Sequence, residues 1–293
     1  MPSSFRSACA ERLGPLLPAR WRASHPLVAV LRLSGVIGAI LPFRQGLSIA
    51  TLAPTLERAF ALRGLTAVAL VVNSPGGSAV QSRLIFARIR ALAEEKKVPV
   101  FTFIEDAGAS GGYMLACAGD EIFADPSSVV GSIGVVSAGF GLDRFIERFG
   151  IERRLHARGS QKAMLDPFRP ERPEDVERLK IIQERIHETF IALVEGRRGS
   201  RLKGERESLY SGAVWAGAEA LDLGLVDGIG DLRTVMRERF GEKVRLKPVA
   251  AARVGLLARL IGRREPTIEA GLLDPAALIA AVEERAAWAR LGL

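Results

Sequence analysis

The sequence predicts an α/β domain built around a mostly parallel sheet. Two apolar runs, Thr66–Val72 and Val98–Ile104, have the composition of strands that are covered on both faces. A segment of helical periodicity, Ser78–Lys96, lies between them, and this strand–helix–strand alternation implies right-handed crossovers. A glycine-rich loop follows each strand, at the sheet edge where ligands bind in folds of this class.

The other elements are predicted from the same two periodicities. Short apolar runs between turn residues indicate strands, and apolar residues spaced three and four apart indicate helices. The expected strands are 27–33, 66–72, 98–104, 121–124 and 129–136. The expected helices are 47–62, 78–96, 113–118, 139–148, 173–196, 215–225 and 232–240, with an irregular loop over 153–172.

Composition divides the chain into three parts. Residues 1–26 form a Pro/Arg-rich basic arm, residues 27–250 carry all the strands and the glycine-rich loops, and residues 251–293 form an Ala/Leu/Arg-rich tail of helical period. We expect one domain, residues 27–250, large enough to hold a catalytic site, followed by a helical C-terminal tail. The tail could supply contacts between copies or cover a site, because Leu256, Leu257, Leu260 and Ile261 lie close together.

Charge and hydropathy exclude several classes of protein. The net charge is +8, but acids are interspersed among the arginines and no aromatic-interleaved basic stripe appears, which argues against nucleic acid as a partner. The 2 cysteines and 3 histidines show no metal-ligand spacing, so we expect no metal and no cofactor. No stretch approaches 18 uninterrupted apolar residues and no secretory leader is evident. These features favour a cytoplasmic location and leave peripheral contact of the basic ends with the inner membrane open.

The stretch Glu105–Tyr113 holds the first candidate for chemistry. It places Ser110 between glycines where a buried strand gives way to a helix. Glycine permits a sharp turn, so the serine hydroxyl could be exposed beside amides that bind an oxyanion. The alternative is that Ser110 merely caps the following helix.

A serine nucleophile needs a base, and the histidines offer no favoured one. His25 precedes the first strand, His156 lies in a basic stretch and His187 lies in the middle of a helix. Lys162 is a better candidate, because apolar residues follow it in its loop and a lysine packed against such surfaces loses hydration, which lowers its pKa. The alternative is an ordinary surface lysine. Ser132, taken alone, is typical of a turn.

Several motifs together resemble a known family over about residues 27–240. They are Val36-Ile37-Gly38, Asn73-Ser74-Pro75-Gly76-Gly77, Ala109-Ser110-Gly111-Gly112-Tyr113, Gly131-Ser132-Ile133-Gly134-Val135, the Lys162 loop with Asp166-Pro167-Phe168, and Gly224-Leu225-Val226-Asp227. In this order and at these intervals they resemble the signal peptide peptidase A group of serine peptidases, family S49, in its short form with one catalytic domain. The chain departs from the family in lacking an evident N-terminal anchor and in having Met114 where an aromatic residue is common.

The resemblance implies a role for each matching residue. Ser110 would be the nucleophile, Lys162 the general base and Ser132 the residue that orients the lysine amine. The amides of Gly76 or Gly77 and of Gly111 would form the oxyanion hole. It implies a ClpP/crotonase-like fold of stacked ββα units and a serine endopeptidase with a Ser–Lys dyad and an acyl-enzyme intermediate. Its substrates would be signal peptides or other short, extended polypeptides.

Two other functions remain open at this point. A crotonase-like acyl-CoA hydratase or isomerase would use Glu105 or Asp106 instead of the serine, and a non-catalytic scaffold would only bind peptides. In each case a single such domain exposes a large apolar area and a shallow site. We therefore expect a ring-like homo-oligomer.

Overall fold

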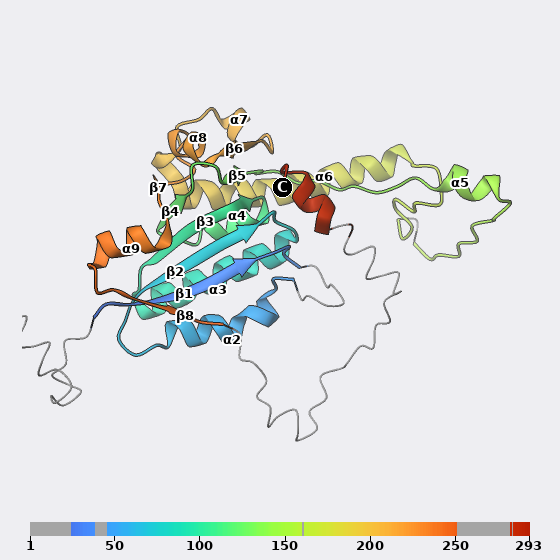
Figure 1. Ribbon diagram of the computed structural model, residues 1–293. Helices are drawn as coiled ribbons and strands as arrows, with labels where there is room; N and C mark the ends of the chain where they lie inside the picture. Colours follow the sequence, from blue (N-terminus) through green and yellow to red (C-terminus); the bar gives the residue numbers. More distant parts are fainter. Residues whose placement is uncertain (1–24, 39–45, 160, 251–281, 283) are drawn as a thin grey trace, which may run out of the picture.

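The computed structural model describes residues 25–38, 46–159, 161–250, 282 and 284–293. Its centre is one twisted sheet with helices on both faces (Figure 1). The strands are β1 Leu27–Ser34, β2 Leu65–Ser74, β3 Val100–Ala109, β4 Glu121–Ala124, β5 Val129–Gly131, β6 Val214–Ala216, β7 Gly228–Ile229 and β8 Arg245–Pro248. The helices are α2 Ile49–Phe60, α3 Ala79–Lys96, α4 Gly111–Ala116, α5 Asp143–Arg148, α6 Pro173–Arg198, α7 Arg206–Leu209, α8 Gly217–Asp222 and α9 Leu232–Phe240, with a 3₁₀ turn η3 at Gly199–Arg201.

The strand order brings the ends of β2 and β3 together. The main path runs β6-β5-β3-β2-β1-β8, and β4 joins the side of β3 and pairs with β7. All pairs are parallel except β5 with β6. β3 pairs first with β4 and then, further along, with β5. The carboxyl ends of β2, β3 and β5 therefore meet at one edge of the sheet, where loops can assemble a site.

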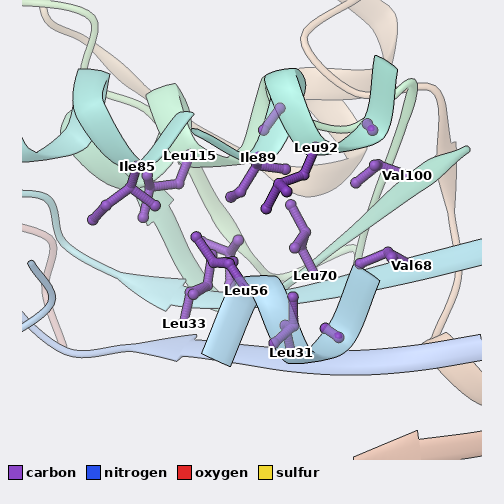
Figure 2. Packing of buried hydrophobic residues seen from close by; sticks show 14 of the residues in the cluster. Leu31, Leu33, Leu56, Val68, Leu70, Ile85, Ile89, Leu92, Val100 and Leu115 are labelled. Carbon is purple, nitrogen blue, oxygen red and sulfur yellow. The ribbon is translucent and has the colours of Figure 1, made fainter. Parts of the chain in front are cut away.

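The core between the sheet and helices α2 and α3 is made of aliphatic side chains that meet from both sides. Leu31 and Leu33 of β1 and Leu70 of β2 face Ile85 and Ile89 of α3 (Figure 2). Burial of each such side chain contributes about 1.5–3 kcal/mol, so this layer fixes α3 and the loop before it against the sheet. On the opposite face, α9 packs over the aromatic side chains of Phe101, Phe103 and Phe123.

A third cluster anchors the short helix α4. The hydroxyl of the fully buried Tyr113 donates a hydrogen bond to the carbonyl of Leu225 at 2.7 Å. Beside it, the guanidinium of Arg198 is 2% exposed and donates to both carboxylate oxygens of Asp227, at 2.7 and 3.0 Å. Asp227 also accepts the amide of Ile122. The start of α4 is thereby tied to a region more than a hundred residues further along the chain.

One segment projects from this body. Residues 135–159 and 161–172, here called the arm, include α5 and extend to the side of the sheet, together with the first half of α6 (Figure 1). Several large apolar side chains of the arm are exposed: Val136, Phe140, Phe145, Phe149, Ile151, Leu155 and Phe168. In the region that the structure describes, no helix is long and apolar enough to cross a membrane.

The sequence predicted most of these elements, and the differences are informative. The strand expected over 129–136 ends at Gly131, and the helix expected over 215–225 begins as strand β6, so both predictions were wrong at those bounds. β3 extends to Ala109 because its end pairs with β5. Of the predicted N-terminal basic arm, residues 1–26, residues 1–24 lie outside the described part of the chain. Of the predicted C-terminal tail, residues 251–281 and 283 lie outside it as well. Residues 284–289 of the tail are helical.

Candidate active site

Ser110 lies at the turn between β3 and α4 in a conformation that few serines adopt. Its φ is 53° and its ψ is −123°, a region that costs about 1–3 kcal/mol for a residue with a side chain. The Ser110 amide donates to the carbonyl of Gly131 at 2.8 Å, which holds the turn against the end of β5. Ser110 occupies the N-cap position of α4, yet its side chain makes no capping hydrogen bond. The alternative that Ser110 merely caps the helix is therefore wrong.

Glycines surround Ser110 because no larger residue fits. A Cβ atom on Gly76 would lie 2.7 Å from the Cβ of Ser110 and 2.9 Å from the amide nitrogen of Gly111. Gly77 is equally confined, by the backbone of Ile37. The predicted glycine-rich loops thus pack directly onto each other at the ends of β2 and β3.

The amides of these glycines differ in what they can bind. The Gly76 amide already donates to the hydroxyl of Ser74, at 3.2 Å. Gly77 is bridged to Ile37 through the amides of Ile37 and Ser78, so its own amide takes no part in the bridge. Gly111 is the first residue of α4, where an amide has no partner within the helix. Of the predicted oxyanion-hole donors, Gly77 and Gly111 are the better placed to bind a further acceptor.

A cavity of about 590 Å³ opens over this turn. Its polar lining includes Ser110 and Ser132. Its apolar lining includes Met114 on α4, Val135 and Val136 after β5, and Ile186 and Phe190 on α6. A cavity with apolar walls and a few polar groups at its base suits an apolar side chain next to a carbonyl that reacts.

Ser132, the second of the two serines that the motifs single out, lies in the cavity wall directly after β5. Its φ is 52°, and its amide donates to the carbonyl of Ala213 at 2.6 Å. The structure therefore brings Ser110 and Ser132 to one cavity from two different strands. Its predicted role in orienting a lysine stays a prediction.

Lys162 is not among the described residues that line this cavity. It lies in a turn of the arm, where its amide donates to the carbonyl of Gly159 at 3.0 Å and its side chain is exposed. The apolar surroundings expected for Lys162 are absent from the part of a single chain that the structure describes. One chain does not bring the predicted nucleophile and the predicted base together.

The carboxylates that a hydratase would need point elsewhere. Glu105 forms an ion pair with Arg32, and Asp106 accepts a hydrogen bond from the side-chain amide of Asn73 at 2.6 Å. Neither carboxylate is among the described residues that line the cavity of Ser110. Among the described residues, the hydratase alternative therefore has neither of its two candidate carboxylates in the cavity of Ser110.

Two further contributions to the site were not assigned to individual residues from the sequence. Ala287, Arg290 and Leu291, near the C-terminus, line the cavity. Figure 1 shows the C-terminal helix close to α6. On α6, His187 contacts the carbonyl of Ile133, at 3.0 Å between Nε2 and the oxygen. The apolar periodicity of the tail was the only signal for the first contribution, and a contact to a backbone carbonyl leaves no signal in the sequence.

Metal binding has no support among the described residues, where no group of three His, Cys, Asp or Glu could hold an ion. Cys117 is buried, and desolvation raises the pKa of its thiol to about 12. Such a thiol stays protonated and unreactive at neutral pH.

Comparison with known proteins places the chain among peptidases. The family model "Peptidase family S49" matches residues 92–245, just over half of the chain and including Ser110, Ser132 and Lys162. A putative signal peptide peptidase SppA of Enterococcus faecium is 32% identical over 171 residues, which cover 57% of this chain and 48% of that protein. The chloroplastic serine protease SPPA of Arabidopsis thaliana is 35% identical over 162 residues, 55% of this chain and 24% of that protein.

A third relative matches along nearly the whole chain. A protein of Brucella abortus (strain 2308) named Na(+)/H(+) antiporter NhaA is 48% identical over 304 residues, which cover 99% of this chain but 40% of that protein. The chain thus spans less than half the length of these relatives. Among solved structures, a variant of the membrane-bound stomatin-specific protease 1510-N is similar with a TM-score of 0.47 and 15% identity, over 78% of this chain and 100% of that chain. A TM-score at this level assigns no fold. The family match and the glycine-flanked serine agree, and the chain belongs to peptidase family S49.

Proposed function

We propose that the chain is a serine endopeptidase that hydrolyses short, extended polypeptides, signal peptides among them. The observation that carries the proposal is the strained turn that places Ser110 in the lining of one cavity together with Gly77 and Gly111. Attack of the Ser110 oxygen on a peptide carbonyl would form an ester, while the two amides hold the oxyanion and the protonated amine departs. Water would then hydrolyse the ester and free the serine.

The proposed general base is Lys162, supplied by a second copy of the chain. Two observations support this: the lysine is exposed on the projecting arm, and the described lining of the cavity in the same chain does not include it. The arm also exposes Phe140, Phe145 and Phe149, whose burial would drive association. Within a homo-oligomer, the arm of one copy would carry Lys162 to the Ser110 of the next. Removal from water there favours the neutral amine, which can accept the serine proton.

The same proposal includes a ClpP/crotonase-like arrangement of ββα units. It also includes the division of the chain into a basic N-terminal arm (1–26), a catalytic domain (27–250) and a helical tail (251–293). Peptides and further copies of the chain are its partners. Cytoplasmic location and peripheral membrane contact stay predictions.

Labelling with a fluorophosphonate tests the nucleophile. The probe should form a covalent bond with Ser110, which peptide mapping locates, and the Ser110→Ala variant should neither react nor cleave peptides. Labelling of a different residue, or peptide cleavage by purified Ser110→Ala, would refute the assignment.

A mixing experiment tests the origin of the base. Ser110→Ala and Lys162→Ala chains should each be inactive alone, because each lacks one half of the dyad. After they are unfolded together and refolded as a mixture, about a quarter of the sites should pair an intact serine with an intact lysine and regain activity. A mixture that stays inactive, while the wild type is active after the same treatment, rules out a base supplied by a second copy.

A further inference from the structure

His187 connects the long helix α6 to the wall of the candidate active site. Its Nε2 atom lies 3.0 Å from the carbonyl oxygen of Ile133, across 54 positions of sequence. A carbonyl oxygen only accepts hydrogen bonds, so Nε2 carries the proton and donates it. The side chain is half-buried on the face of α6 that turns toward the cavity, where Ile186 and Phe190 line the wall.

The Ile133 carbonyl belongs to a peptide bond that is held at both ends. The amide of the same peptide, that of Gly134, donates to the carbonyl of Ser132 at 2.9 Å and closes a three-residue turn. His187 holds the carbonyl end. The chain between these two contacts has little freedom to rotate.

This turn begins with strained backbone. Gly131 has a φ of 109° and Ser132 a φ of 52°. A non-glycine residue keeps such a conformation only where its surroundings fix it. The bonds from the Ser132 amide to the Ala213 carbonyl and from the Ser110 amide to the Gly131 carbonyl fix it here, and the His187 contact holds the peptide that follows.

The fixed segment forms one wall of the cavity. Ser132, Gly134, Val135 and Val136 line the cavity, whereas the side chain of Ile133 points into the core and is fully buried. Because Ile133 is anchored by its side chain on one side and by His187 through its carbonyl, the backbone from Ser132 to Val136 presents a defined edge. An extended peptide would lie along an edge of this kind.

We propose that His187 is a positioning residue for peptide binding: its imidazole fixes the Ile133–Gly134 peptide and thereby the backbone edge along which the substrate lies. The inference rests on the proposed peptidase function. His187 touches neither Ser110 nor, by this account, the substrate. Its loss should therefore weaken the binding of an extended peptide and leave the reactivity of Ser110 itself intact.

Three variants separate the hydrogen bond from the stability of the helix. His187→Leu keeps an apolar side chain but removes the donor, and His187→Gln keeps an N–H at a similar distance from the backbone. Glu188→Leu is the matched control, because Glu188 is exposed on the same helix and pairs only with Arg185 among the described residues. All three are made in the full chain.

Hydrolysis of a fluorogenic peptide and labelling by a small fluorophosphonate are measured for each variant. In His187→Leu the KM for the peptide should rise about tenfold with little change in kcat, since the cost is that of one lost hydrogen bond. The labelling rate should stay within about twofold of wild type. His187→Gln should restore most of the affinity, and Glu188→Leu should behave as wild type. Equal KM values for His187→Leu and Glu188→Leu would overturn the inference, and so would a parallel loss of labelling and hydrolysis.

Amide hydrogen exchange provides a readout that does not depend on catalysis. The Gly134 amide should exchange faster in His187→Leu, while amides around Val194 on the same helix keep their protection. Unchanged exchange at Gly134 would contradict the role of His187 even in a chain that cleaves no peptide. Absence of labelling at Ser110 in the wild type would instead refute the proposed function, so the two failures are distinguishable.

Discussion

The Cβ atom that an alanine at Gly76 would add lies 2.7 Å from the Cβ of Ser110. The two residues come from loops after different strands, β2 and β3, and their contact sets the distance between the proposed nucleophile and the proposed oxyanion donors. A residue with a side chain at position 76 has to push these loops apart.

Gly76→Ala should therefore abolish most of the activity. A displacement of about 1 Å at a reacting group costs about a hundredfold in rate, so we expect at least that loss in kcat/KM. Gly35→Ala is the matched control, because Gly35 has a φ of 103°, close to the 104° of Gly76, but nothing lies within 4 Å of an added Cβ. Both variants should lose about 1–3 kcal/mol of stability from backbone strain, measured by urea unfolding. Equal loss of activity in the two variants would contradict the steric argument.

The Arg198–Asp227 pair should make stability depend on acid pH. Burial raises the pKa of the Asp227 carboxyl, but the hydrogen bonds and charge of Arg198 outweigh this effect, and its pKa is lowered overall. A lowered pKa in the folded state contributes stability that is complete above the unfolded value of about 3.9 and is lost as pH falls toward the folded value.

Asp227→Asn should remove that part of the pH dependence. It should also cost about 3 kcal/mol at pH 7, because the buried guanidinium of Arg198 loses its counter-charge. Asp222→Asn, exposed at the end of α8, is the control and should change the free energy of unfolding by less than about 0.5 kcal/mol. Urea unfolding at pH 7 and pH 3.5 measures both effects. A free energy of unfolding for Asp227→Asn that falls as steeply with acid as that of wild type would show that Asp227 is not the group responsible.

The C-terminal residues should restrict access to Ser110. Ala287, Arg290 and Leu291 line its cavity, so a chain that ends at Ala281 should react faster with a bulky fluorophosphonate, by a few-fold or more. Arg285→Ala serves as the control, because Arg285 is exposed and is not among the described lining residues. A second-order labelling rate that does not change on truncation would mean that the segment leaves the entrance open.

The exposed aromatic residues of the arm should hold copies together. The rings of Phe145 and Phe149 lie 5.0 Å apart and are 58% and 65% exposed. The double change Phe145→Ser and Phe149→Ser should shift light scattering toward monomer, while far-UV circular dichroism should show a chain that is still folded. Val80→Ser is the control, because Val80 is 66% exposed on α3, outside the arm. Unaltered assembly of the double variant would locate the interface elsewhere.

Local sequence was sufficient to predict the elements that bury their own side chains. The apolar runs of β1 and β2 and the periodicity of α3 and α9 mark them without reference to partners. β8 was missed because Arg245–Pro248 is polar and becomes a strand only by pairing with β1. The two-residue β7 likewise exists only through its pairing with β4.

The same limit applies to the candidate site: its local turn could be predicted from the sequence, but its long-range contacts could not. Ser110 and its glycines form a local pattern, since a sharp turn between strand and helix requires those residues in that order. The position of Lys162 depends on the arm, whose path no periodicity records. The contact between His187 and Ile133 involves a backbone carbonyl, which any residue at position 133 would provide. Only the folded chain can reveal such a contact.

Lys162 is exposed on the arm, and its proposed supply by a second copy has a kinetic consequence. A site assembled from two copies exists only above the concentration at which the copies associate, so specific activity would fall on dilution rather than stay constant. Under the proposed function, newly made chains would then remain harmless to neighbouring polypeptides until enough of them had accumulated, and a cell could silence the proposed activity by lowering the abundance of the chain alone.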